Sequence, residues 1–252
     1  MTIYCSDPYN VSINGLTIAN SASHSIHLAI GYKPDHPDDL IRWVKIFTWR
    51  ANGDGVGSSG NQVVEDCFVR TQDDAAYVGG RGMRRVVFWL DSNGCVFILN
   101  HIGTEGINAH PLVIEDISVV YVRTKFPHVG GNIFDLRGVG EGEGGYTITF
   151  RNFVVEDPRP THQAFNLKMQ GVEPWGNLDK RRGPGDLYGI TFENISIKSR
   201  AVIEDEPELL WGMEDGLIYG LVFDNVTIGN QTVDSVDFFH HNQYVFDDLK
   251  TY

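Results

Sequence analysis

The stretch Val64-Glu65-Asp66-Cys67-Phe68-Val69 decides the fold, because the same pattern returns along the chain. Each copy is an apolar strand, an Asp or Asn at a bend, and a second apolar strand whose side chains alternate with period two. Asp and Asn tolerate left-handed backbone angles and hydrogen-bond their own backbone, so they suit sharp corners between strands. Further copies begin at Ile114, Phe150, Phe192 and Phe223, and a looser copy spans residues 11–18.

The corner residues set the length of the repeat. They are Asp66, Asp116, Asn152, Asn194 and Asn225, with spacings of 50, 36, 42 and 31 residues. These gaps correspond to one coil plus loop insertions, or to two coils for the longest gap. An irregular repeat of this length predicts an all-β solenoid, which we expect to occupy residues 1–252 as one domain. A β-sandwich is the structural alternative, because short alternating strands with turn signals also fit it.

The composition limits the partners. The 252 residues are 42% hydrophobic and carry a net charge of −13 with a pI of about 5.0. We therefore expect no nucleic-acid partner, because phosphate binding needs basic surface. A polyanionic substrate is disfavoured too, although a local basic pocket would overrule the total charge. The chain lacks the apolar run of about 18 residues that a membrane span needs, so we predict no membrane contact.

The start of the chain, Met1 to Asp7, has neither the basic start nor the apolar core of a signal peptide. We expect a secreted or periplasmic protein whose leader is absent from this chain, with a cytoplasmic protein as the alternative. The strand-like start leaves the first coil uncapped, and exposed sheet edges favour association. A homo-oligomer or a missing N-terminal domain is therefore an open alternative.

The three cysteines, Cys5, Cys67 and Cys95, have no metal-type spacing and are interpreted as buried small hydrophobic residues. Cys67 lies in a strand pattern, so we expect it to be internal and reduced. No cluster of His, Cys and Asp has zinc spacing, and we predict no metal and no cofactor.

Two acidic turns carry the candidate chemistry. Asp54 lies in Asn52-Gly53-Asp54-Gly55, and the pair Asp73-Asp74 follows 19 residues later. Each motif alone is an ordinary turn signal, but together they are one coil apart. Strands of adjacent coils lie about 4.8 Å apart, so the carboxyl groups are expected to converge. Acid/base hydrolysis of a sugar linkage needs such an arrangement.

These motifs resemble a known family. Residues 44–55 and 64–68, with Asp73-Asp74, resemble the core of the polygalacturonase-like right-handed β-helix hydrolases, the clan of glycoside hydrolase families 28 and 49. In the next coil, residues 86–96, Asn93-Gly94 is closer to the dextranase and isopullulanase type of family 49 than to the Gly-His-Gly of family 28. The specific match covers about residues 41 to 100. The β-sandwich domain that precedes the family 49 helix has no counterpart here.

The resemblance implies a single-stranded right-handed parallel β-helix, a pectin-lyase-like solenoid, that hydrolyses a polysaccharide or oligosaccharide with inversion. Asp73 would be the general acid, and Asp54 and Asp74 would activate water. Acid and base would then lie roughly 6.5–9.5 Å apart. Because adjacent strand residues point to opposite faces, we expect a bulge or a strand end at Asp73-Asp74. A neutral α-glucan is the first expected substrate and a pectic polymer the second.

The remaining candidates are substrate-binding residues: Asn52, Tyr77, Arg81, Asn93, His101, Lys168 and Trp175. Aromatic rings can stack on sugars, Arg81 could contact hydroxyls, and Lys168 is a weak match to the Arg-x-Lys of family 28. For the loop residues, a purely structural or solvated role is the alternative. Two other functions stay open: a non-catalytic carbohydrate-binding β-helix and a structural fibre or adhesin solenoid.

Overall fold

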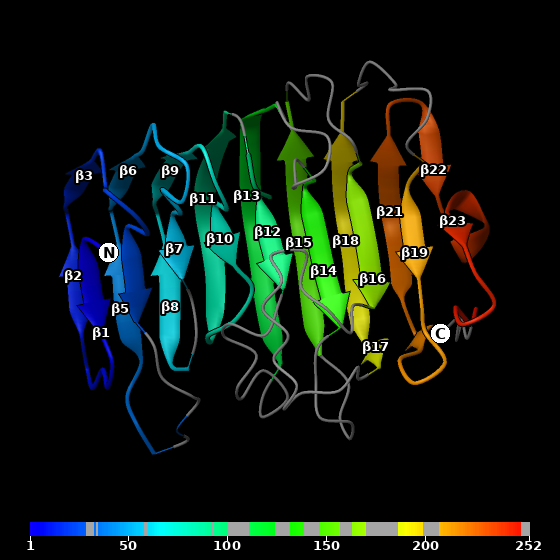
Figure 1. Ribbon diagram of the computed structural model, residues 1–252, viewed down its shortest axis with the longest axis horizontal. Coiled ribbons are helices and arrows are strands. Elements are labelled where there is room, and N and C mark those ends of the chain that lie inside the picture. The colour runs from blue at the N-terminus through cyan, green and yellow to red at the C-terminus, as the bar shows by residue number, and fades with distance from the viewer. Residues whose placement is uncertain are drawn as a thin grey trace.

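The computed structural model describes residues 1–28, 33, 35–57, 60–91, 93–99, 111–123, 132–138, 147–156, 163–169, 186–198 and 207–247. These residues form an all-β structure with two long sheets, of nine and twelve strands, stacked along the long axis (Figure 1). The helical structure within them is the short 3-10 helix η2 (Val236–Phe238). None of the described helices is long and apolar enough to cross a membrane.

The strands of the nine-stranded sheet are, in spatial order, β1 (Ile3–Cys5), β4 (Ile26–Leu28), β7 (Val56–Gly57), β10 (Ala76–Tyr77), β12 (Phe97–Leu99), β14 (Phe134–Gly138), β16 (Phe165–Met169), β19 (Leu209–Trp211) and β23 (His240–His241). This order follows the chain, so each coil adds one strand to the same edge.

The strands of the twelve-stranded sheet are β2 (Ser12–Asn14), β5 (Asp39–Arg42), β8 (Gln62–Glu65), β11 (Gly82–Leu90), β13 (Leu112–Val122), β15 (Ile148–Val155), β18 (Ile190–Ile197), β21 (Val222–Ile228) and β22 (Gln231–Val233), with β3 (Thr17–Ala19), β6 (Lys45–Phe47) and β9 (Phe68–Thr71) paired alongside. A small sheet joins β17 (Leu187–Tyr188) to β20 (Ile218–Tyr219). Among the strand pairs described, only β21 and β22 are antiparallel. Parallel pairing argues against the β-sandwich, whose sheets are antiparallel, and is compatible with a β-helix.

The predicted corners are confirmed. The five predicted corner residues have left-handed backbones: Asp66 (φ 54°), Asp116 (55°), Asn152 (59°), Asn194 (53°) and Asn225 (53°). Their side chains bond from coil to coil, as in Asn225 Nδ2 to Asn194 Oδ1 at 2.8 Å and Asn152 Nδ2 to Asp116 Oδ1 at 3.0 Å. Arg85 (φ 53°) is an additional corner inside the 50-residue gap, so that gap holds two coils, as one reading of the spacing allows.

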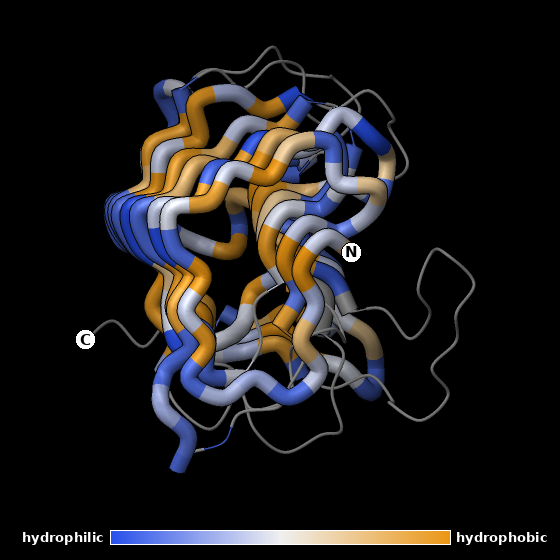
Figure 2. Tube along the Cα trace, turned by 90° about the vertical axis from the view of Figure 1, so that its left-hand side faces the viewer, coloured by the Kyte–Doolittle hydropathy of each residue, from blue (hydrophilic) through white to orange (hydrophobic). Residues whose placement is uncertain are grey.

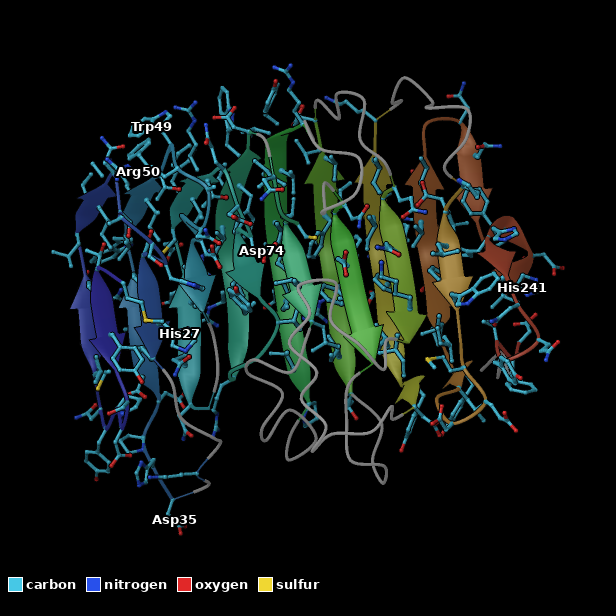
Figure 3. The ribbon with its side chains drawn as sticks, in the orientation of Figure 1. His27, Asp35, Trp49, Arg50, Asp74 and His241 are labelled. Carbon is cyan, nitrogen blue, oxygen red and sulfur yellow. The ribbon has the colours of Figure 1, made fainter. Side chains whose placement is uncertain are left out.

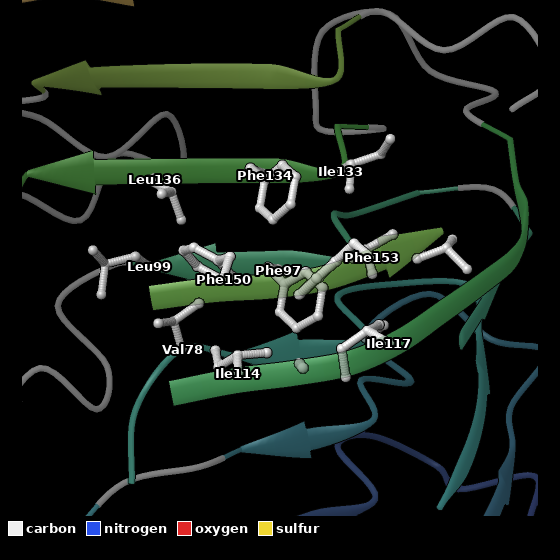
Figure 4. Packing of buried hydrophobic residues seen from close by; sticks show 14 of the residues in the cluster. Val78, Phe97, Leu99, Ile114, Ile117, Ile133, Phe134, Leu136, Phe150 and Phe153 are labelled. Atoms are coloured by element: carbon white, nitrogen blue, oxygen red, sulfur yellow. The ribbon is translucent and has the colours of Figure 1, made fainter. Parts of the chain in front are cut away.

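Phenylalanines dominate the core between the sheets. Phe97, Phe134 and Phe165 come from adjacent strands of the nine-stranded sheet, with ring centroids 5.8 and 5.0 Å apart in successive pairs. Phe150 of the opposite sheet packs against Phe134 edge-on at 5.0 Å (Figure 4). Seen along the stack, hydrophobic positions repeat in register from coil to coil (Figure 2). Burial of this repeated stripe stabilises the stack, because each coil covers the apolar face of its neighbour.

The cysteine prediction for the core is confirmed for Cys67, which is buried and free, and burial raises the pKa of its thiol to about 11. Cys95 is also buried, whereas Cys5 is only partly buried.

Candidate active site

The three candidate carboxylates lie at the starts of adjacent strands. Asp54 precedes β7, and Asp73 and Asp74 precede β10, which is the next strand of the nine-stranded sheet. Backbone hydrogen bonds fix the two turns on each other, with Gly55 N donating to Asp74 O at 2.9 Å. The convergence expected from single-coil spacing is therefore present.

The predicted strand end at the aspartate pair is confirmed. Asp73 lies in a bend, Asp74 lies ahead of the strand, and β10 begins only at Ala76. Ala75 and Ala76 are both fully buried in the core, so the inward–outward alternation is interrupted just after Asp74. This interruption lets consecutive acidic residues stay out of the apolar core.

Asp54 is the least exposed residue of the three aspartates. The residue is 4% exposed, and its Oδ2 accepts a hydrogen bond from the Tyr77 hydroxyl at 2.6 Å. The same oxygen lies 3.0 Å from Nδ1 of His24, which precedes β4 on the neighbouring coil. This contact with Asp54 raises the pKa of His24, against the opposing effect of burial.

Asp73 accepts several N–H donors. Its Oδ2 receives the backbone N–H of Asn52 at 2.6 Å and Nδ2 of Asn93 at 3.3 Å. Its Oδ1 receives the backbone N–H of Asp74 at 3.1 Å. Burial, followed by the negative charge of Asp54, nevertheless raises the pKa of Asp73, while these donors lower it. A raised pKa is the property that a general acid needs.

Asp74 receives fewer N–H donors to offset its burial than Asp73 does. Its Oδ1 accepts the backbone N–H of Cys95 at 2.8 Å. Burial, then the charges of Asp54 and Asp73, raise its pKa well above the usual range. The surroundings therefore favour a proton on Asp74 even more than on Asp73. Figure 3 labels Asp74 together with His27, which both belong to the region of the nine-stranded sheet.

Gly94 allows this close packing. Its φ is +73°, and a Cβ there would lie 2.5 Å from the Asp73 carbonyl carbon and 2.8 Å from Asp74 Oδ1. Only glycine combines that backbone angle with so close an approach. Asn93 thus contacts Asp73 through its side chain, and Gly94 leaves room for Asp74 because it has no side chain.

The structure separates the predicted binding residues. Asn52 and Asn93 lie at Asp73, Asn52 through its backbone and Asn93 through its side chain. The expectation that Tyr77 stacks on sugar is wrong, because Tyr77 is only 5% exposed and its hydroxyl is bonded to Asp54.

Arg81 and Lys168 do not join the aspartates. Arg81 follows the far end of β10, pairs with Asp38 at 3.1 Å, and lines a separate groove of about 600 Å³ along the twelve-stranded sheet. Lys168 lies on β16, the third strand from β10 in the sheet order, so roughly 14 Å separates the two strands. Two further candidates, His101 and Trp175, lie outside the described residues.

The sequence reasoning missed His24 and His27. Their rings meet edge-on at 6.2 Å, and the His24 ring stacks on Tyr77 at 6.3 Å. Nδ1 of His27 is buried without a hydrogen-bond partner, and a side chain at Gly57 would clash with it. One signal was available: His24, Asp54 and Asp74 each stand two residues before a strand of the nine-stranded sheet.

Within the described part of the chain, no group of three or more His, Cys, Asp or Glu side chains is arranged to hold a metal ion. No protein-family model matches this sequence, and no curated protein matches it. The case for a function therefore rests on the geometry of the site and on the motifs that form it.

Proposed function

We propose that this chain is an inverting glycoside hydrolase built on a single-stranded right-handed parallel β-helix. The observation that carries the proposal is the meeting of Asp54, Asp73 and Asp74 at adjacent strand starts, with two of their pKa values raised. The coil-by-coil strand order of both long sheets supports the β-helix. Its handedness is inferred from the family resemblance and from the general preference for right-handed parallel connections.

In the proposed reaction, water attacks the anomeric carbon as the glycosidic C–O bond breaks. Asp54 and Asp74 hold the attacking water, and the proton that it releases passes to the Asp54 carboxylate. The proton held between Asp73 and Asp74 goes from Asp73 to the leaving oxygen. The enzyme regains its starting state when these protons exchange with solvent. Attack and departure on opposite faces of the sugar ring produce inversion.

Asp73 and Asp74 have different functions in the proposed proton donation. Asp73 is the donor that the family resemblance implies, yet Asp73 accepts three N–H donors whereas Asp74 accepts one from Cys95. Two neighbouring carboxyls resist simultaneous ionisation, so one proton is held between them. We assign its delivery to Asp73 and its retention to the burial of Asp74 and the nearby negative charges.

Substrates with activated leaving groups test this assignment. An aryl glycoside with a weakly basic phenol departs without acid assistance. The variant of the true acid, Asp73→Asn in our assignment, keeps turnover on such a substrate while losing it on the natural linkage. If only Asp74→Asn shows that pattern, the roles of the two residues are exchanged.

A neutral α-glucan fits the site better than a pectic polymer. The net charge is −13, and the cluster itself holds three carboxylates. Lys168, which would have to grip a galacturonate carboxylate, lies three strands away. An anionic sugar would therefore meet uncompensated repulsion at the aspartates.

Reducing-sugar release from dextran, pullulan, starch, polygalacturonate and arabinan tests the function. We expect release from dextran or pullulan by the wild type and its loss in Asp73→Asn. Asp35→Asn, which removes an exposed carboxylate outside the cluster, is the matched control and keeps full activity. Release that persists unchanged in Asp73→Asn would refute the role of the cluster.

A non-catalytic carbohydrate-binding protein is the second candidate, favoured by one observation. The Asp54 side chain is only 6% exposed and is already engaged by Tyr77 and His24, as a purely structural carboxylate would be. This candidate predicts saccharide affinity without product release by the wild type. Calorimetry with the same polymers separates it from the hydrolase.

A further inference from the structure

His24 has the contacts of a working part of the proposed site. Its Nδ1 is buried 3.0 Å from Asp54 Oδ2, an ion-pair contact without hydrogen-bond alignment, and the same oxygen accepts the Tyr77 hydroxyl at 2.6 Å. The two partners come from the coils on either side of Asp54, since His24 precedes β4 and Tyr77 lies in β10. The carboxylate is thereby held from both directions along the stack.

Exposure distinguishes the two members of this pair. The side chain of His24 is 25% exposed, whereas that of Asp54 is 6% exposed. His24 can therefore exchange protons with solvent directly, while Asp54 is shielded. A titratable group between solvent and a buried carboxylate controls the net charge that the carboxylate experiences.

Neighbouring charges and burial determine which protonation form of His24 is favoured. Asp54 and Asp73 favour its charged form, whereas burial and the positive chain N-terminus oppose it. His27 packs edge-on against it from β4, and the pKa of His27 is lowered by burial and by His24. Of this histidine pair, His24 is thus the one whose surroundings favour the positive charge.

We propose that His24 is a positioning residue of the site, whose imidazolium holds the Asp54 carboxylate in its orientation beside the acidic pair. This inference rests on the proposed function for its catalytic consequence, but the His24–Asp54 pairing itself does not. The cation beside Asp54 leaves the proton of the cluster to Asp73 and Asp74, whose surroundings favour the protonated form. The division into one base and one acid then follows from a cation supplied by the preceding coil.

The pairing is tested without any sugar by titrating the histidine rings by NMR. The chain has nine histidines, and the His24 signal is the one that is absent in His24→Asn. We expect the pKa of His24 to fall by about one unit in Asp54→Asn, since an opposite charge at this distance shifts a pKa by roughly 1–3 units. An unchanged His24 titration in folded Asp54→Asn would overturn the pairing.

The catalytic consequence is tested by the pH profile of sugar release. His24→Asn keeps an N–H near the Nδ1 position but cannot become charged, so the acid limb is expected to move up by about one pH unit. His36→Asn, a half-buried histidine that packs on Tyr9, is the control and keeps the wild-type profile. A His24→Asn profile that superimposes on the wild type would overturn the positioning role. If the wild type releases no sugar at all, the proposed function fails, and the NMR titration still decides the pairing.

Discussion

Gly94 shows how a single residue holds the aspartate turns together. Its φ of +73° nearly equals the +71° of Gly15, but the two sites differ in space. A Cβ at Gly94 would collide with the backbone of Asp73 and Asp74, whereas a Cβ at Gly15 would meet nothing within 4 Å. A comparison of alanine variants at Gly94 and Gly15 therefore separates the cost of a left-handed backbone from the cost of a steric clash.

Gly94→Ala is expected to destabilise the protein by about 3 kcal/mol, and Gly15→Ala by only about 1 kcal/mol. The smaller value is the usual cost of a left-handed alanine, and the larger one adds displacement of backbone. Urea unfolding of both variants measures the difference. Equal losses would mean that the Gly94 turn relaxes freely and does not fix the aspartates.

Asp74 provides a test of the electrostatics. Its pKa in the folded protein is raised above the unfolded value, so its stabilising contribution is complete below the unfolded pKa and is lost as the pH rises through the folded pKa. At pH 7 its ionisation therefore opposes folding. Asp74→Asn keeps the acceptor for Cys95 N and removes that opposition.

We expect Asp74→Asn to be more stable than the wild type by about 1–2 kcal/mol at pH 7, or several degrees in Tm, and to lose activity. The gain should shrink as the pH falls toward 4, where the wild-type carboxyl is protonated. Thermal unfolding from pH 4 to 8 measures it, with Asp35→Asn as the control. A loss of stability at pH 7 would show that Asp74 is compensated by charge.

Among the elements, the corners between strands were the most predictable. Asn and Asp occupy left-handed corners at low cost, so their recurrence marks the coils in the sequence. Trp43 (φ 54°) and Arg85 (φ 53°) take the same conformation without that signal. Side-chain contacts accompany these exceptions: Arg85 Nε donates to Asp66 Oδ1 of the preceding coil at 2.7 Å, and the guanidinium of the adjacent Arg42 lies 4.1 Å from the Trp43 ring.

The ladder of corner amides contributes its own stability. Asn194 accepts a hydrogen bond from Asn225 at 2.8 Å, and its own Nδ2 donates to Asn152 Oδ1 at 3.4 Å. Asn194→Ala is expected to cost about 2 kcal/mol, because the variant loses both the side-chain bonds and the residue type suited to φ 53°. Asn194→Gly, which restores only the backbone freedom, should recover about half. Identical losses in the two variants, measured by urea unfolding, would assign the whole effect to the side-chain bonds.

The candidate site was predictable only in part, because some of its contacts join residues that are far apart in the sequence. The sequence identified Asp54, Asp73, Asp74 and Asn93 because each of their motifs is a short contiguous stretch. Successive motifs are one coil apart. His24 was missed because its partner Asp54 is 30 residues away and the pairing depends on register. Tyr77 was assigned to solvent because a strand pattern does not show which outward positions are covered.

For the whole molecule, the phenylalanine core ties the coils into one stack. Phe134 is fully buried and contacts rings of both sheets, including Phe97, Phe150 and Phe165. Phe134→Ala is expected to cost about 3–5 kcal/mol, the usual loss for a buried aromatic residue. Phe246→Ala, at a site 46% exposed, should cost less than about 1 kcal/mol. A small loss at Phe134, measured by denaturant unfolding, would contradict a continuous core.

We propose that the three carboxylates hydrolyse a glycosidic bond with inversion. The most direct test follows the anomeric configuration of the first product by proton NMR, using the polymer that the wild type cuts. We expect an α-linked glucan to yield the β-anomer first and Asp73→Asn to yield no product. Initial release of the α-anomer, or no release from any polymer by the folded wild type, would contradict it.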